Sequence, residues 1–200
     1  MELRPSYPIT TARLRLRPLT VADTAELLDY RGRADTCRYL PFGPMDEQIL
    51  TTRLAGDLGR REITSEGESL TLGVELATSG RLVGDVVLFF RSAVNAGGEI
   101  GYVFHPDIAG HGYATEACTA VLDLAFARAD GLGLRRVVAR MDARNEASAR
   151  LASRLGMRLE AHHRGSEMFK GEWADLVVYA LLDHEWEALR SAGAPGRDAS

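Results

Sequence analysis

The sequence predicts a mixed α/β (α+β) fold, in which one sheet has an antiparallel N-terminal half and a central parallel pair of strands. Segments that alternate polar and apolar residues recur along the chain, and a Thr-Ser-Gly turn at 78–80 joins two of them as a hairpin. From 99 to 141 the order is strand, helix, strand, a crossover that makes its two strands parallel. Neither an internal repeat nor a second boundary divides the chain, so we expect a single domain at 1–190.

The first quarter of the chain predicts one strand and two helices. Residues 11–19 alternate polar and apolar side chains, as in a strand with one solvated face. Thr20, with Asp23 three positions later, predicts a helix start. A second amphipathic helix is expected at 46–61. The intervening segment 31–45 is irregular and apolar, and it either packs against the body or lines a substrate pocket.

The remaining elements follow from β-forming runs, apolar stripes and glycines. Strands are expected at 69–77, 81–90, 99–104, 135–141, 157–161 and 176–182, a long helix after the small-residue turn at 109–114, and a short helix at 146–155. Gly131 and Gly133 predict the end of the longer helix, and Gly156 the end of the shorter one. Residues 191–200 have the composition of a flexible C-terminal tail.

The composition is that of an ordinary globular domain, and it argues against some classes of binding partner. Of the 200 residues 46% are apolar and 26% charged, and the net charge of -4 gives no support for nucleic-acid binding. No run approaches the ~18 apolar residues of a membrane span. The N-terminus lacks a signal-peptide core, so we expect no membrane partner and a cytoplasmic location. Cys37 and Cys118 fit no metal or redox spacing, and no metal is expected.

The stretch 99–117, EIGYVFHPDIAGHGYATEA, predicts an anion site, because a strand runs through a small-residue turn into a helix. The first amides of a helix lack intrahelical partners and lie at the positive end of its dipole. Gly110 and Gly112 carry no side chain that would keep a phosphate away. A P-loop is excluded because the only lysine is Lys170, and a dinucleotide fingerprint would need a third small residue where Thr115 stands. The alternative that this stretch is only a tight turn between strand and helix stays open.

Three stretches, in order, resemble the GNAT acetyltransferase superfamily, and within it the RimJ/RimL-like branch. The acetyl-CoA signature of that family is Gln/Arg-x-x-Gly-x-Gly/Ala, and Gly112 and Ala114 occupy its last two fixed places. A second element, Asn-x-x-Ser/Ala before a helix, occurs at 145–148, and a third is the ending DLVVYAL at 175–181. The resemblance covers 10–186, nearly the whole chain.

The resemblance implies the GNAT-type fold and acetyl-CoA as cosubstrate. In that fold the two parallel strands splay apart, and the pantetheine arm lies between them. The cofactor-binding residues so implied are the backbone of Tyr102, Val103 and Phe104 for the arm, the amides of Gly110, His111, Gly112, Tyr113, Ala114 and Thr115 for the pyrophosphate, and Asn145 for the arm. Asn145 also stands where a residue caps the short helix, and it can do both.

Acetyl transfer requires a neutral amine, and amines with a pKa of ~8 or above are mostly charged at pH 7. Glu99 is the candidate general base, because it opens the strand beside the acetyl site and resembles a base position in several superfamily members. The alternative is a solvated carboxylate at a strand end.

The departing thiolate requires a proton. Many GNAT enzymes supply it from a tyrosine seven residues after the motif asparagine, a position held here by Ala152. Ser148, on the first turn of the same helix, is the candidate acid, and relatives in this branch have serine there. Its alternative role is a helix-start hydrogen bond. A thiolate with a pKa of ~8.5 can also take its proton from water.

By resemblance the acceptor is a protein N-terminal α-amine of the ribosomal-protein type. A small-molecule amine, such as an antibiotic or a polyamine, is the alternative, because acceptor pockets in this fold come from variable loops. A module of another class, which holds acyl-CoA without catalysis, stays open because Ala109 replaces the Gln or Arg of the signature and Ala152 replaces the tyrosine. Whether acyl groups other than acetyl are used, and whether the protein forms a homodimer, also stay open.

Overall fold

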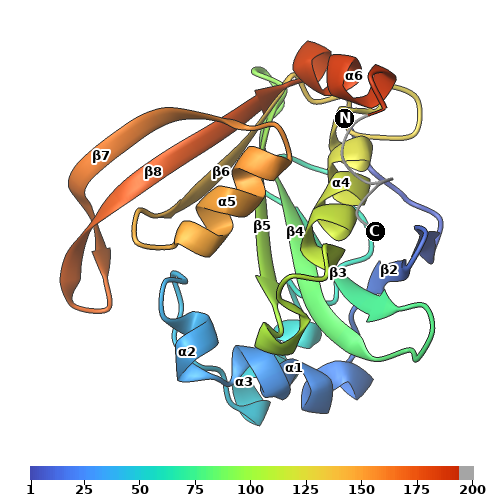
Figure 1. The fold of residues 1–200 in the computed structure, drawn as a ribbon. Coiled ribbons are helices and arrows are strands. Elements are labelled where there is room, and N and C mark those ends of the chain that lie inside the picture. Colours follow the sequence, from blue (N-terminus) through green and yellow to red (C-terminus); the bar gives the residue numbers. More distant parts are fainter. Residues whose placement is uncertain (194–200) are drawn as a thin grey trace.

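The computed structural model describes residues 1–193 as one eight-stranded sheet with helices packed on it (Figure 1). The strands are β1 (Ile9–Thr10), β2 (Leu14–Pro18), β3 (Ser69–Leu76), β4 (Leu82–Ser92), β5 (Gly97–Phe104), β6 (Arg136–Asp142), β7 (Arg158–Phe169) and β8 (Glu172–Leu182), in the sheet order β1-β2-β3-β4-β5-β6-β8-β7. Neighbouring strands are antiparallel except β5 and β6. The predicted mixed α/β class is confirmed.

Six α-helices and two 3₁₀ turns connect the strands in the described part of the chain. They are η1 (Val21–Asp23), α1 (Thr24–Arg31), α2 (Ala34–Cys37), α3 (Glu47–Leu54), η2 (Pro106–Ile108), α4 (Tyr113–Phe126), α5 (Glu146–Arg154) and α6 (Asp183–Ser191). In Figure 1, α4 and α5 lie across one side of the sheet and α1, α2 and α3 lie together at one end of it. Buried side chains form two cores, the larger with α4 and α5 and the smaller with α1 and α3.

Residues of β5 alternate between these two cores. Ile100 belongs to the larger cluster, which α4 completes with Val121 and Leu122. Val103 belongs to the smaller cluster, which α1 completes with Leu27. Because successive strand residues point to opposite faces, neighbouring positions of β5 serve different sides of the sheet.

The parallel strands β5 and β6 separate after three residue pairs. The pairs are Gly97 with Arg136, Gly98 with Val137 and Glu99 with Val138. Beyond them β6 keeps its pairing with β8 as far as Asp142, whereas β5 keeps its pairing with β4. The two strands thus form a fork that opens after Glu99, and the predicted splay of the central parallel pair is confirmed.

Local sequence signals explain where the first helices begin. The Asp23 carboxylate accepts hydrogen bonds from the Thr20 backbone N–H at 2.7 Å and from its hydroxyl at 3.1 Å, so the predicted start is confirmed. Asp46 caps α3, since its Oδ1 accepts the Ile49 N–H at 2.8 Å. The predicted continuation of α3 to residue 61 is wrong. The helix ends at Leu54 with Ala55 as its C-cap, and the chain leaves helical geometry in a turn in which the Leu58 N–H donates to the Arg53 carbonyl at 2.9 Å.

Helix α4 also ends earlier than the glycines predicted. It stops at Phe126, and the following loop turns back so that Leu132 and Leu134 are buried beneath it. Their backbone N–H groups donate to carbonyls of the last helical turn, at Leu124 and Ala125. Burying these two leucines stabilises the fold more than continuing the helix for four more residues would.

The C-terminal hairpin is longer than predicted, and one helix was missed. Strands β7 and β8 extend to a turn at Lys170-Gly171, where φ is 49° and 89°. The polar, exposed run at 162–169 has no apolar alternation that would have indicated a strand. Helix α6 follows β8 directly, and the buried Trp186 anchors it. Of the tail predicted at 191–200, residues 194–200 lie outside the described part of the chain.

Candidate active site

A cleft of about 1890 Å³ opens where β5 and β6 separate. One wall is the end of β5 with the turn that leads into α4, and the opposite wall is the start of α5. Residues 35–40 close the cleft on a third side, so the segment at 31–45 both lines a pocket and packs inward, through the buried Cys37 and Met45. The cleft brings the predicted cofactor residues of β5, the glycine turn and α5 to one place.

The turn before α4 has the geometry of an anion site. Gly110 and Gly112 have φ of 84° and 76°, in the left-handed region that favours glycine. Gly112 is the N-cap of α4 and offers no side chain to the free amides. Within residues 1–193, the N–H groups of 112–115 donate to no other group, and the first helical bond runs from Glu116 N–H to Gly112 O. Four amides are thus unpaired at the positive end of the helix, and Gly112, Ala114 and Thr115 line the cleft.

Two arginines from other elements flank these amides, and the sequence did not indicate either. Arg13 donates from Nη1 to the His111 carbonyl at 3.0 Å, and its guanidinium lies 4.7 Å from the centre of the Tyr113 ring. Arg154 of α5 reaches Thr115 Oγ1 from Nε at 3.4 Å. Both line the cleft. The turn is therefore surrounded by positive charge, which suits phosphate groups.

Glu116 holds Arg13 in this place. Its carboxylate accepts Arg13 Nε at 2.7 Å, the Arg13 backbone N–H at 2.8 Å and Thr11 Oγ1 at 2.6 Å. Partial burial alone would raise the pKa of Glu116, but hydrogen bonds from Thr11 and Arg13 bring the pKa below its ordinary value. The carboxylate is therefore ionised at neutral pH and clamps the loop before β2 against α4.

The end of β5 has one free edge. Tyr102, Val103 and Phe104 pair with β4 on one side, whereas β6 has moved away on the other. Their backbone groups on that edge are free of the sheet and line the cleft. The Tyr102 side chain crosses the cleft floor and donates from its hydroxyl to the Ser148 carbonyl at 3.0 Å. Burial raises the pKa of Tyr102 well above its ordinary value, so the phenol stays protonated.

Helix α5 presents Asn145 and Ser148 to the cleft. Asn145 caps the helix, since its Oδ1 accepts the Ser148 N–H at 3.1 Å. The Ser148 hydroxyl makes no hydrogen bond to any residue in 1–193, so the predicted alternative of a helix-start bond through that hydroxyl is not observed. Ala152 is fully buried and does not line the cleft.

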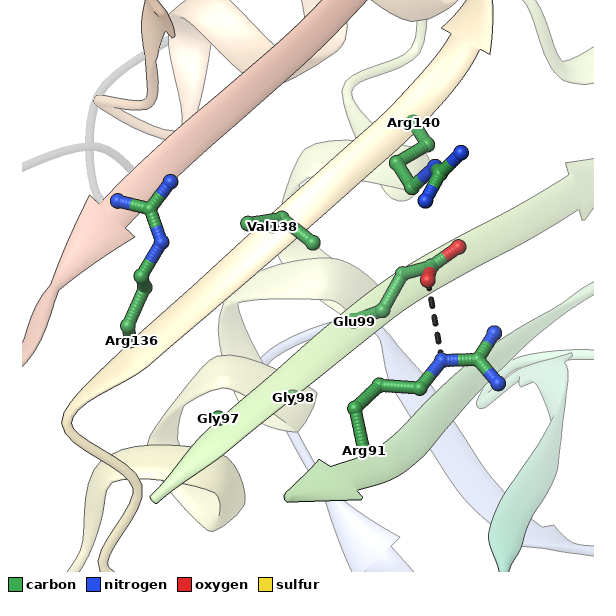
Figure 2. Close-up of a pocket in the computed structure, with 7 residues that line it drawn as sticks. All are labelled: Arg91, Gly97, Gly98, Glu99, Arg136, Val138 and Arg140. Atoms are coloured by element: carbon green, nitrogen blue, oxygen red, sulfur yellow. Dashed lines mark hydrogen bonds and ion pairs between the residues drawn. The ribbon is translucent and has the colours of Figure 1, made fainter. Parts of the chain in front are cut away.

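Glu99 lies elsewhere, in a second hollow of about 570 Å³ along the paired stretch of β5 and β6 (Figure 2). The hollow is lined by Arg91, Gly97, Gly98, Glu99, Arg136, Val138 and Arg140. Glu99 Oε2 accepts a hydrogen bond from Arg91 Nε at 3.1 Å, and the glutamate side chain is 19% exposed. The structure thus separates Glu99 from Tyr102, Val103 and Phe104 of the cofactor cleft, although all four residues lie on β5.

Residues 1–193 contain neither a membrane-spanning helix nor a metal-binding group of side chains. No helix there is long and apolar enough to cross a membrane. No group of three or more His, Cys, Asp or Glu side chains in that part of the chain is placed to hold a metal ion.

The strand fork and the helix-start anion site together define an acyltransferase of the GNAT fold, and comparisons with known proteins agree. A family model of the acetyltransferase (GNAT) domain matches residues 13–158. YnaD of Bacillus subtilis (strain 168), named as an uncharacterized N-acetyltransferase, is 29% identical over 181 residues, which cover 89% of this chain and 98% of YnaD. The chain therefore belongs to the GNAT acetyltransferase family.

Solved structures share the same architecture. The acetyltransferase (GNAT family) from Bacillus anthracis superposes with a TM-score of 0.78 at 28% identity, covering 88% of this chain and 99% of that one. RimL, named as a ribosomal L7/L12 α-N-protein acetyltransferase and solved in complex with coenzyme A, gives a TM-score of 0.75 at 19% identity, covering 90% and 99%. At that identity RimL shows the fold alone.

Proposed function

We propose that this protein transfers the acetyl group of acetyl-CoA to a primary amine, and that the amine is the α-amine of a protein N-terminus. The observation that carries the proposal is the cleft itself, in which the free edge of β5 leads to the unpaired amides at the start of α4. The name of the fold neighbour RimL points to the same class of acceptor. A small-molecule amine is the alternative outcome of the experiment below.

The residues present fit acetyl-CoA. Its pyrophosphate would be held by the amides of 112–115, with Arg13 and Arg154 beside them. Its extended pantetheine arm would take the place of a strand along Tyr102–Phe104, where β6 has left the edge of β5 free. When bound, acetyl-CoA supplies an activated thioester. The protein's own tasks are to orient that ester, to neutralise the amine and to protonate the leaving thiolate.

Two reactants would approach the fork through separate openings. The cofactor-side residues line the large cleft, whereas Glu99 lies in the smaller hollow, at the last paired position before the strands separate. An amine entering from the hollow would meet the Glu99 carboxylate before the thioester. Glu99 can then take the proton of the ammonium group, directly or through one water molecule.

The assay that decides the function measures thiol release from acetyl-CoA with a panel of peptides and small amines. Acetylation of peptide α-amines with acetate found at the N-terminus would support the proposal. Transfer only to small amines would establish the alternative acceptor. Binding of acetyl-CoA with no transfer to any amine would indicate a non-catalytic module.

Replacement of Glu99 by glutamine is expected to lower turnover by ~100-fold at pH 7, the lower range for a positioned general base. The loss should shrink as pH rises toward 9, because more of an α-amine with a pKa of ~8 is then already neutral. Acetyl-CoA affinity should be unchanged, since Glu99 lies outside the cofactor cleft. Rates from pH 6 to 9 test this, and a loss independent of pH would assign Glu99 a positioning role.

Ser148→Ala tests the proton donor. Turnover is expected to fall by up to ~100-fold if the free hydroxyl protonates the thiolate. Because this hydroxyl makes no bond within residues 1–193 and Asn145 provides the cap, the stability cost should be below ~1 kcal/mol. Asn145→Ala, which removes that cap, should cost ~1 kcal/mol and serves as the stability reference. Unchanged turnover in Ser148→Ala would exclude this hydroxyl and leave water as the donor.

A further inference from the structure

Three arginines and one glutamate line the hollow around Glu99, and each arginine is paired with a glutamate. Arg91 of β4 and Arg136 and Arg140 of β6 line it, with Glu99 as its one acidic residue. Figure 2 shows the Glu99 carboxylate between Arg91 and Arg140, with Arg136 on the far side of Val138. Guanidinium groups on both sides of the carboxylate would repel a substrate whose only charged group is a protonated amine.

The arginines differ in how many donors they have left. Arg136 uses both terminal nitrogens on Glu160, so it is the least available. Arg140 donates from Nη2 to Glu167 at 3.0 Å, and Arg91 donates from Nε to Glu99 at 3.1 Å. Within residues 1–193, the two terminal nitrogens of Arg91 and the remaining nitrogens of Arg140 donate to no other group.

Arg91 is held in a fixed orientation, and the floor beside it is open. Its guanidinium lies 4.2 Å from the centre of the Phe89 ring, which orients it as a flat surface toward the hollow. Next to it Gly97 has no side chain, and a Cβ there would have only Ser92 Cβ as a neighbour, at 4.0 Å. The hollow therefore has room for a group that would accept hydrogen bonds from Arg91.

We propose that this hollow binds an acceptor that carries a carboxylate close to its amine, so that the amine meets Glu99 while the carboxylate meets Arg91 and Arg140. The inference rests on the proposed acetyltransferase function and names the substrate class of that site. Two guanidinium groups next to the amine disfavour its protonated form and attract its anionic neighbour. A planar guanidinium with free donors matches a carboxylate in both charge and shape. An N-terminus with an acidic residue in its first positions satisfies this requirement.

The experiment compares two peptide amides that differ in one charge, Ser-Glu-Ala-Ala and Ser-Gln-Ala-Ala, by kcat/KM at low ionic strength. The parent protein is expected to prefer the acidic peptide by about 10-fold or more, the effect of one charge-assisted contact. In Arg91→Gln and Arg140→Gln this preference should fall toward 1, through KM for the acidic peptide, and the ratio of the two peptides' kcat/KM within each variant measures it independently of any change in overall rate. Free glutamate as a third acceptor distinguishes a small metabolite from a peptide.

A steric variant and a charge control complete the test. Gly97→Leu fills the hollow without removing a charge or touching the cofactor cleft, so acceptor use should fall while acetyl-CoA affinity stays. Arg128→Gln removes an arginine that is 74% exposed and lines neither pocket, and it should leave the preference unchanged. Equal kcat/KM for the two peptides, or a preference that persists in both arginine variants, would overturn the inference. Absence of transfer to every amine would instead overturn the proposed function.

Discussion

Replacement of Gly112 by leucine is expected to weaken acetyl-CoA binding by ~100-fold or more, which corresponds to the loss of one to two charge-assisted hydrogen bonds. Gly112 has φ of 76°, and a Cβ there would lie 3.4 Å from Arg13 Nη2. A leucine side chain would therefore stand on the amides of 112–115 and push aside the arginine next to them. Isothermal titration calorimetry of the parent and the variant measures the effect.

Gly80→Leu is the matched control for this variant. Gly80 has φ of 73°, close to that of Gly112, but it lies in the turn between β3 and β4 with open space around it. Both variants carry the same backbone strain of ~1–2 kcal/mol, so both should lose similar stability. Only Gly112→Leu should lose acetyl-CoA. Undiminished binding in Gly112→Leu would show that the phosphates are held elsewhere.

The sequence predicted the parts of the site that lie within one continuous stretch. The segment 99–117 has the order strand, glycine turn, helix, which indicates both β5 and the anion site at the start of α4. Both features depend on backbone geometry that neighbouring residues determine. The cap at Asn145 follows from the same kind of local rule. These features need no knowledge of distant contacts.

Side chains that reach the site from elsewhere could not be predicted in this way. Arg13 is 98 residues from the His111 carbonyl to which it donates, and nothing in its strand pattern distinguishes it from Arg15. The face on which Glu99 lies depends on strand register, because a shift of one residue exchanges the two faces of a sheet. A sequence pattern indicates alternation but does not say which face meets the cofactor.

The polar, exposed end of the β7–β8 hairpin is a further example. Its turn residue Lys170 donates from Nζ to the carbonyls of Cys37 and Arg38, 133 and 132 residues away, and so reaches the segment that closes the cleft. Arg144, beside the start of α5, lies 5.7 Å from the ring of Tyr39 in the same segment. The closed side of the cleft is thus a product of tertiary contacts between irregular segments.

Asp85→Ala is expected to destabilise the protein by about 3–5 kcal/mol, the cost of leaving a buried charge without its partner. Asp85 of β4 is fully buried and accepts Arg31 Nη2 at 2.6 Å, Arg31 Nε at 2.8 Å and the Tyr30 hydroxyl at 2.8 Å. Arg31 is itself only 4% exposed, and its Nη1 already lacks a hydrogen-bond partner within residues 1–193. Loss of about a fifth or more of a total stability of ~5–15 kcal/mol should be evident in urea unfolding followed by circular dichroism.

The double variant Arg31→Met with Asp85→Leu separates the buried charge from the packing of α1 on β4. Replacing both partners with apolar side chains removes the uncompensated guanidinium, so this variant should be more stable than Asp85→Ala by at least ~2 kcal/mol. If the double variant is as unstable as Asp85→Ala, shape rather than charge determines the stability of this contact. Because α1 leads into residues 35–40 of the cleft wall, Asp85→Ala should also weaken acetyl-CoA binding, whereas the double variant should restore it.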